Sequence, residues 1–281
     1  MKPTSSISRA LKASLVTASI LFLVACSGTT FLYNRLGTII PWYVDRYVDL
    51  TRDQKSFLKE ELKPFLAWHR QEELPFYLEL LQFIEMKVQQ PLTQADVREI
   101  YDRSSLIFDH LNVESTKWSI ALGEKLSDEQ IEEFLEKLQE DQAEYEEKYL
   151  PRTDEEYREE NVEEIVDSFE NFLGRLTEEQ RVLVAMGAAQ LQRWDSLWLS
   201  NRQQWLDDLT ELLEREPGWQ QRAMAMVDRQ DENFSEEYNT VYEHNIDVMC
   251  GLIAEVNNVR TPKQERKALR KLAGYKEDLE T

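Results

Sequence analysis

The sequence has little cysteine, glycine or proline. Its 281 residues include two Cys, eight Gly and eight Pro. No run of alternating apolar and polar residues is bounded by turn residues, which is the pattern of a half-buried strand. Cys26 is assigned another role below, so Cys250 has no partner for an internal disulfide. The sequence therefore argues against a sheet protein, and it predicts that Cys250 is a buried structural thiol.

Motifs for metals and cofactors are also missing. His69, His110 and His244 are widely separated, and neither His-x-x-Glu-His nor Cys-x-x-Cys occurs, so no metal site is predicted. There is no Gly-x-Ser-x-Gly, P-loop or glycine-rich nucleotide turn, so no cofactor and no catalytic residue is assigned. A pair of catalytic carboxylates stays open among the 54 Asp and Glu residues, because such a pair meets in space and not in sequence.

Basic charge is scarce over the chain as a whole. Lys and Arg number 33, which gives a net charge of −21. Nucleic acid is therefore not expected as a partner, since phosphate binding needs a basic footprint. Seven Trp, eleven Tyr and eleven Phe supply large apolar side chains, which predicts a folded chain despite the charge.

The apolar run near the start of the chain is short. Residues 13–25 carry no charge, but a helix needs about 20 residues to span a bilayer. Lys2, Arg9 and Lys12 precede this run, and no acidic residue occurs before Cys26. A basic start followed by a short apolar run is typical of a signal peptide, here residues 1–25.

The apolar run ends in Leu23-Val24-Ala25-Cys26, followed by Ser27. This stretch resembles the lipobox of bacterial lipoproteins. The resemblance implies cleavage before Cys26 and a lipid, of the palmitate class, on its sulfur. Residues 26–30 would then be a short lipidated tether. Ser27 is not the Asp that retains lipoproteins at the inner membrane, so the resemblance implies the outer membrane, facing the periplasm, with the inner membrane as the alternative.

Helix starts recur along the rest of the chain. In each, a Ser or Thr stands three residues before a Gln, Glu or Asp, the spacing of a capping box, in which the two residues satisfy each other's backbone N–H groups. These starts are Thr51, Thr93, Ser127, Thr153, Thr177 and Thr261. Apolar residues follow at helical spacing. The sequence predicts one all-α domain over residues 31–281, an elongated bundle of antiparallel helices.

The apolar spacing also gives the extents of several helices. Two short helices are expected on either side of Pro41, and Pro75 is expected to open a new helix after the one that contains His69. Further helices are predicted over the ranges 93–124, 177–214, 219–231 and 235–258.

Charge is distributed unevenly along the chain. Residues 127–170 have a net charge of −15 and predict an acidic helical hairpin, either a solvated face or a surface for a basic partner. Residues 260–276 have a net charge of +6 and predict a basic terminal helix. That helix either contacts anionic lipid, packs on the acidic hairpin of its own chain or is solvated.

Aromatic residues give the candidate interaction surfaces. Trp42 and Tyr43 follow Pro41 and lie either in a membrane interface or against the body of the domain. Trp194, Trp198 and Trp205 form a stripe that is either a ligand groove or part of the core.

Two resemblances to known families exist. Three helix starts read Leu-(Thr/Ser)-x-x-Gln, at Leu50, Leu126 and Leu176, and resemble the motif of small helical periplasmic chaperones. A wider stretch resembles an uncharacterised family of proteobacterial lipoproteins, which implies a helical lipoprotein and no particular activity. Its matching segments are Tyr33-Asn34-Arg35-Leu36, Pro41-Trp42-Tyr43-Val44-Asp45, Tyr47-Val48-Asp49-Leu50-Thr51-x-x-Gln54, Ala67-Trp68-His69-Arg70 and Glu73-Leu74-Pro75.

Three functions follow as hypotheses. The first is a non-catalytic lipoprotein, anchored through Cys26, that acts by protein–protein contacts in envelope assembly or maintenance with an envelope partner still to be identified. The second is a chaperone-like holdase, which needs an exposed apolar concavity. The third is an enzyme on cell-wall glycan or peptide, which needs a polar cleft with two carboxylates about 5–10 Å apart.

Overall fold

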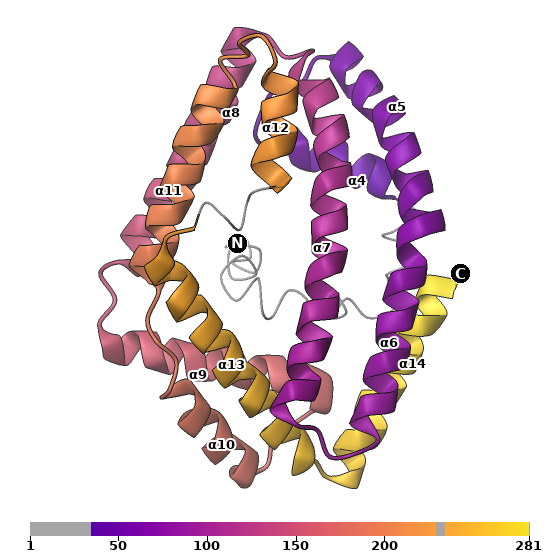
Figure 1. Ribbon diagram of the computed structural model, residues 1–281, viewed down its shortest axis with the longest axis vertical. Coiled ribbons are helices and arrows are strands. Elements are labelled where there is room, and N and C mark those ends of the chain that lie inside the picture. The colour runs from indigo at the N-terminus through magenta and orange to yellow at the C-terminus, as the bar shows by residue number, and fades with distance from the viewer. Residues whose placement is uncertain (1–34, 229–233, 281) are drawn as a thin grey trace, which may run out of the picture.

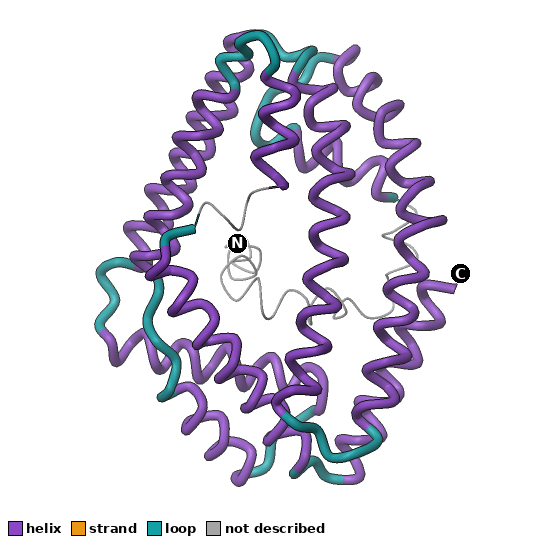
Figure 2. The backbone as a smooth tube through the Cα atoms, viewed as in Figure 1, coloured by secondary structure: helices purple, strands orange, loops and turns teal. Residues whose placement is uncertain are grey.

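A computed structural model describes residues 35–228 and 234–280 (Figure 1). Every regular element in these ranges is a helix and none is a strand, so the predicted all-α fold is confirmed (Figure 2). The predicted signal peptide, Cys26 and the tether lie outside the described residues. None of the described helices combines the length and the apolar character that a membrane crossing needs.

The helices form an elongated frame (Figure 1). Long helices α7 and α13 pack on each other inside it, α8 and α11 pair along one edge, and α6 pairs with α14 along the other. The elements are α4 (Leu36–Val44), α5 (Arg52–Trp68), the π-helical turn η1 (His69–Glu73), α6 (Leu74–Val88), α7 (Gln94–Gly123), α8 (Asp128–Tyr149), α9 (Asp154–Leu173), α10 (Glu178–Ala188), α11 (Asp195–Leu212), α12 (Trp219–Asp228), α13 (Glu236–Asn258) and α14 (Pro262–Glu280).

The predicted capping boxes are present at all six helix starts. Thr51, for example, accepts a hydrogen bond from the backbone N–H of Gln54, whose side-chain oxygen accepts one from the N–H of Thr51. The same reciprocal pair occurs at Thr93, Ser127, Thr153, Thr177 and Thr261. Each box satisfies two backbone N–H groups that a helix start otherwise leaves unpaired.

The chain repeats one order of helices in two halves. In the first half α4 packs on α5, and α5 and α6 pack on α7; in the second, α9 packs on α10, and α10 and α11 pack on α13. The last helix of each half packs on the third helix of the other: α8 lies along α11 and α14 lies along α6. Helix α12 has no counterpart in the first half. The two halves are therefore interlocked and form one body.

A pair of glutamines closes each half. In the first half the side-chain amides of Gln54 and Gln130 exchange two hydrogen bonds of 2.7 and 2.9 Å. In the second half Gln180 and Gln264 exchange bonds of 3.3 and 2.8 Å. Each of these glutamines also belongs to a capping box, so two helix starts are joined back to back at each end of the frame.

The predicted helix over 177–214 is wrong: it is interrupted between α10 and α11. The chain leaves helical geometry at residues 189–194, where the Asn245 side chain from α13 bonds both the N–H and the C=O of Gln192, at 2.8 and 2.9 Å. Those bonds replace helical ones. The interruption turns α11 away from α10, so that α11 lies along α8.

One proline prediction is wrong and the other is confirmed. Pro41 lies inside α4, which is a single described helix, and does not separate two helices. Pro75 lies in the first turn of α6, as predicted, but no loop precedes that helix, because α5 continues into α6 through η1. A proline lacks the N–H that bonds the preceding turn, and a local π-turn is a common way of absorbing that loss.

The acidic and basic segments are arranged differently from a hairpin with a free tail. The acidic helices α8 and α9 separate, α8 packing on α11 and α9 on α10 and α14 (Figure 1). The basic helix α14 packs on the end of α9: Lys267 Nζ donates to the carbonyl of Glu170 and Lys271 Nζ to that of Asn171, both at 3.1 Å. Cations at a helix C-terminus stabilise it through the helix dipole. Of the three alternatives for this helix, packing on its own chain is observed.

Candidate functional site

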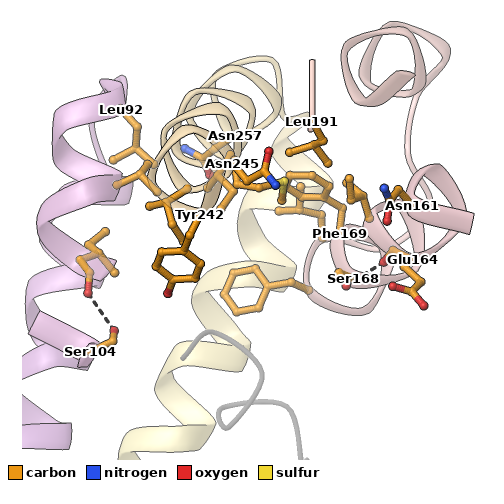
Figure 3. A pocket seen from close by; sticks show the side chains of 18 of the residues that line it. Leu92, Ser104, Asn161, Glu164, Ser168, Phe169, Leu191, Tyr242, Asn245 and Asn257 are labelled. Atoms are coloured by element: carbon orange, nitrogen blue, oxygen red, sulfur yellow. Dashed lines mark hydrogen bonds between the residues drawn. The ribbon is translucent and has the colours of Figure 1, made fainter. Parts of the chain in front are cut away.

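A cavity lies between the two halves. Its volume is about 260 Å³ and it is partly open to solvent. Helices α6, α7, α9, α13 and α14 and the link between α10 and α11 form its walls. Figure 3 shows Leu92 and Ser104 at one side, Asn161 and Glu164 at the other, and Tyr242 and Phe169 between them.

The walls are mostly apolar because three helices present an apolar stripe. On α9 the stripe contains Ile165, Phe169 and Leu173, spaced four residues apart. On α13 it contains Ile246 and Met249, and α7 and α14 add further aliphatic side chains. Residues four apart lie on one face of a helix, so each stripe points inward together.

The polar atoms on the walls are mostly satisfied by neighbours. The hydroxyls of Ser104 and Ser168 each donate to the carbonyl four residues earlier, both at 2.8 Å (Figure 3). The hydroxyl of Tyr242 pairs with that of Tyr101, and burial raises the pKa of Tyr242 well above its usual range. Asn245 is held by Gln192, as described above. These groups leave little polarity directed into the cavity.

Two amide groups on the walls do not face the cavity. The Nδ2 atoms of Asn161 and Asn257 are buried and have no close hydrogen-bond partner within the described part of the chain. Burial raises the pKa of Tyr157, and the amide of Asn161 beside its hydroxyl opposes the rise. Because water reaches neither Nδ2 atom, neither donor is directed into the open part of the cavity.

The charged groups at one end of the cavity neutralise one another. Asp195 is only 9% exposed and accepts from Arg152 at 2.7 Å and from Arg193 at 3.2 Å. Arg152 also bonds Glu160, and Arg193 bonds Asp154 at 3.0 Å. This cluster ties the starts of α9 and α11 together. A buried charge needs such partners, and a group so fully paired is poorly suited to act as an acid or base.

The three predicted tryptophans do not lie on one surface. Trp194 caps α11 and lines the cavity, with its ring 5.8 Å from Tyr238 and 5.9 Å from Tyr242. Trp198 packs edge-on against Tyr145 of α8 at 5.5 Å, and Trp205 is 40% exposed. Of the three, Trp194 belongs to the cavity.

Trp42 and Tyr43 lie on the outside of α4. Trp42 is 61% exposed and Tyr43 is 41% exposed, so neither ring is buried against the body of the protein. The Arg46 guanidinium lies 5.8 and 5.9 Å from the two ring centroids. We call Trp42, Tyr43 and Arg46 the α4 surface.

A second buried group, which the sequence analysis did not identify, lies at η1. Glu73 is 1% exposed, one of its oxygens lies 3.4 Å from Nδ1 of His110, and the other has no partner among the residues described. Burial raises the pKa of Glu73 and lowers that of His69, in the same turn, to about 4. Pro75 was the available signal, since it marks the irregular turn. No group of three or more His, Cys, Asp or Glu within the described ranges could hold a metal ion.

The fold and the cavity define an interlocked all-helical protein with an internal apolar pocket. The chain belongs to a family of unknown function, DUF6279, whose model matches residues 46–239. This agrees with the predicted membership of an uncharacterised family. Searches of curated proteins and of solved structures gave no match.

The cavity itself was not predicted. Its walls come from residues as far apart in sequence as Ile84 and Leu272, and each stripe taken alone is indistinguishable from an ordinary core stripe. Trp194 was the single predicted site residue that lines it.

Proposed function

We propose that this chain is a lipid-anchored, non-catalytic binding protein of the cell envelope. It is attached through Cys26 to the outer membrane, faces the periplasm and acts in envelope assembly or maintenance through contacts with an envelope partner. Sorting to the inner membrane is the alternative location.

The apolar character of the cavity is the observation that carries the binding role. A hydrolase with paired carboxylates needs a polar cleft in which two carboxyl groups face the substrate. Here Asp195 is neutralised by Arg152 and Arg193, and the other carboxylate on the walls, Glu164, lies among side chains that are mostly aliphatic and aromatic. Such a recess is suited to holding a ligand and offers little for bond cleavage.

The α4 surface supports the membrane location. Leu36, where α4 begins, is ten residues after Cys26, a reach of at most about 35 Å. Trp and Tyr side chains are enriched at membrane–water interfaces, where the ring is apolar and its polar edge stays hydrated. A lipid on Cys26 would hold the exposed rings of Trp42 and Tyr43 close to the headgroups.

Fractionation of cells that express a Cys26→Ala variant tests the anchor. We expect the parent protein in the outer-membrane fraction and the variant in the soluble periplasm. Cys250→Ala is the control, because it removes the other cysteine, which is buried in α13. If Cys26→Ala still co-fractionates with the outer membrane, the anchor is wrong. If the parent is found in the inner membrane, the alternative location holds.

A chaperone-like holdase is the second candidate, and one observation favours it. Val182 and Met186 are 58% and 60% exposed on α10, one turn after the Leu176-Thr177-x-x-Gln180 start. Residues four apart share one face, so the two form a small apolar surface. Suppression of client aggregation by the parent, and its loss in Val182→Ser/Met186→Ser, would support this function. Leu106→Ser is the control, because Leu106 is a similarly exposed apolar residue on another helix, α7. If the parent does not suppress aggregation, the holdase function is excluded.

A further inference from the structure

We propose that the cavity between α7, α9 and α13 binds a single acyl chain. This inference concerns the ligand of the cavity. It stands whether or not the chain is anchored through Cys26.

The size and the walls of the cavity favour one hydrocarbon chain. Its volume of about 260 Å³ lies just below the range of about 300–1,000 Å³ for pockets that take drug-sized ligands. That volume holds no more than one chain, and because the cavity is partly open, one end of the chain can extend out of it. The aliphatic and aromatic stripes of α9 and α13 give such a chain apolar contacts along its length.

The paired polar groups on the walls favour a hydrocarbon chain over a peptide. The hydroxyls of Ser104 and Ser168 already donate to their own helices, and Asn245 is held by Gln192. A peptide segment would bring an N–H and a C=O for almost every residue, and each buried group would need a partner that these walls do not offer. A hydrocarbon chain needs none.

The acyl chain has two possible sources. It is either a free fatty acid or single-chain lipid of the envelope, or a chain of the lipid carried by Cys26 of the same molecule. The chemistry of binding is the same in both cases. The experiment below separates them, because only the second source disappears in Cys26→Ala.

Native mass spectrometry on full-length protein is the first test. The lipidated parent is purified from membranes in mild detergent, Cys26→Ala from the periplasm, and palmitate or a lysophospholipid is added to each. Binding of one lipid by both proteins supports an envelope source. Binding by Cys26→Ala alone shows that the cavity of the parent is filled by its own lipid. If neither protein binds palmitate or lysophospholipid, the proposal is overturned.

One variant with a matched control locates the binding. Ser104→Phe places a ring in the cavity, and Ser119→Phe on the same helix is its control, because Ser119 is exposed and its hydroxyl also donates to the carbonyl four residues earlier. Thermal melts first establish that each variant is folded. We expect palmitate affinity to fall about tenfold or more in Ser104→Phe and to be unchanged in Ser119→Phe. Unchanged affinity in a folded Ser104→Phe would overturn the proposal.

Discussion

The two glutamine pairs compare one motif in two environments. In the first half the arrangement is symmetric: Gln54 Nε2 also donates to the carbonyl of Lys125, and Gln130 Nε2 to that of Asp49, both at 2.7 Å. Each of these carbonyls lies two residues before the capping residue of the other helix. All four glutamines cap a helix, but Gln54 and Gln130 are only half-buried and keep some access to water.

In the second half the pair is buried and the symmetry is broken. Gln180 is 0% exposed and Gln264 is 4% exposed. Gln264 Nε2 donates to the carbonyl of Arg175 at 3.1 Å, in the position equivalent to the first half, but Gln180 Nε2 reaches the carbonyl of Val256 at 3.2 Å, inside α13. The second pair therefore fastens three helices, α10, α13 and α14. The same local motif is a surface cap in one half and a core contact in the other.

Gln180→Met should produce the largest effect on this comparison. Methionine has a similar volume, so the change removes hydrogen bonds and little packing. It leaves the carbonyl of Val256 and the N–H of Thr177 without partners, and it removes both bonds to the amide of Gln264, which keeps its bond to the carbonyl of Arg175. We expect the unfolding free energy to fall by about 3 kcal/mol, since each unsatisfied buried group costs about 1–3 kcal/mol. Equilibrium urea unfolding measures it; a loss below about 1 kcal/mol would show that water replaces the amide.

The two halves also differ in the connection between their second and third helices. In the first half η1 joins α5 to α6 without a break, whereas in the second half the irregular residues 189–194 join α10 to α11. The pKa of His69 in the folded state, about 4, is below its ordinary value of 6.5. Between these values the unfolded chain binds a proton that the folded chain does not, so stability falls as pH falls. We expect His69 alone to lower the unfolding free energy by about 2–3 kcal/mol between pH 7 and pH 4, after allowance for its partial exposure to solvent.

His69→Phe isolates this effect, because the unfolded variant no longer gains that proton. Its unfolding free energy relative to the parent should therefore rise as pH falls. Glu73 acts in the opposite direction: its raised pKa means that the folded state takes up a proton first as pH falls. The parent alone therefore shows a smaller net slope. A parallel pair of stability curves from pH 7 to pH 4 would contradict the buried His69.

Gln54→Met should have a smaller effect than the change at Gln180. Two helices, α5 and α8, also start at this glutamine pair. The groups that lose a hydrogen bond are half-buried, however, so water can replace the missing partner. We expect a loss of about 1 kcal/mol, the usual size of a lost cap. Urea unfolding of the two glutamine variants side by side gives the comparison directly. Equal losses of unfolding free energy would show that burial does not determine how much each glutamine pair contributes to stability.

The sequence predicted what local spacing determines and missed what depends on distant partners. The helix starts at Thr51 and Thr177 follow from side chains three residues apart, so they were predictable. The interruption at residues 189–194 was not, because the apolar spacing from Leu183 to Trp194 continues and the residue that holds Gln192, Asn245, is 53 residues away in the chain. Apolar periodicity shows that a face is buried and does not identify its partner.

The same limit applies to the cavity and to the paired glutamines. Asn257 reads as one more polar residue near the end of a helix, and its place on the cavity wall appears only when α9 and α13 face each other. Gln54 and Gln130 are 76 residues apart, and Gln180 and Gln264 are 84 apart. A capping box accounts for each glutamine through residues next to it in the chain. The sequence therefore gives no indication that the same side chain also bonds a second glutamine.

The hydroxyl caps should show the smallest difference between the halves. Thr51 and Thr177 each accept one hydrogen bond from the backbone three residues ahead, at 3.3 and 3.2 Å, and neither hydroxyl reaches another helix. Thr51→Ala and Thr177→Ala should therefore each cost about 1 kcal/mol, as measured by urea unfolding. If Thr177→Ala costs as much as Gln180→Met, the whole start of α10 acts as one cooperative unit. If it costs no more than Thr51→Ala, the difference between the halves lies in the glutamine amides alone.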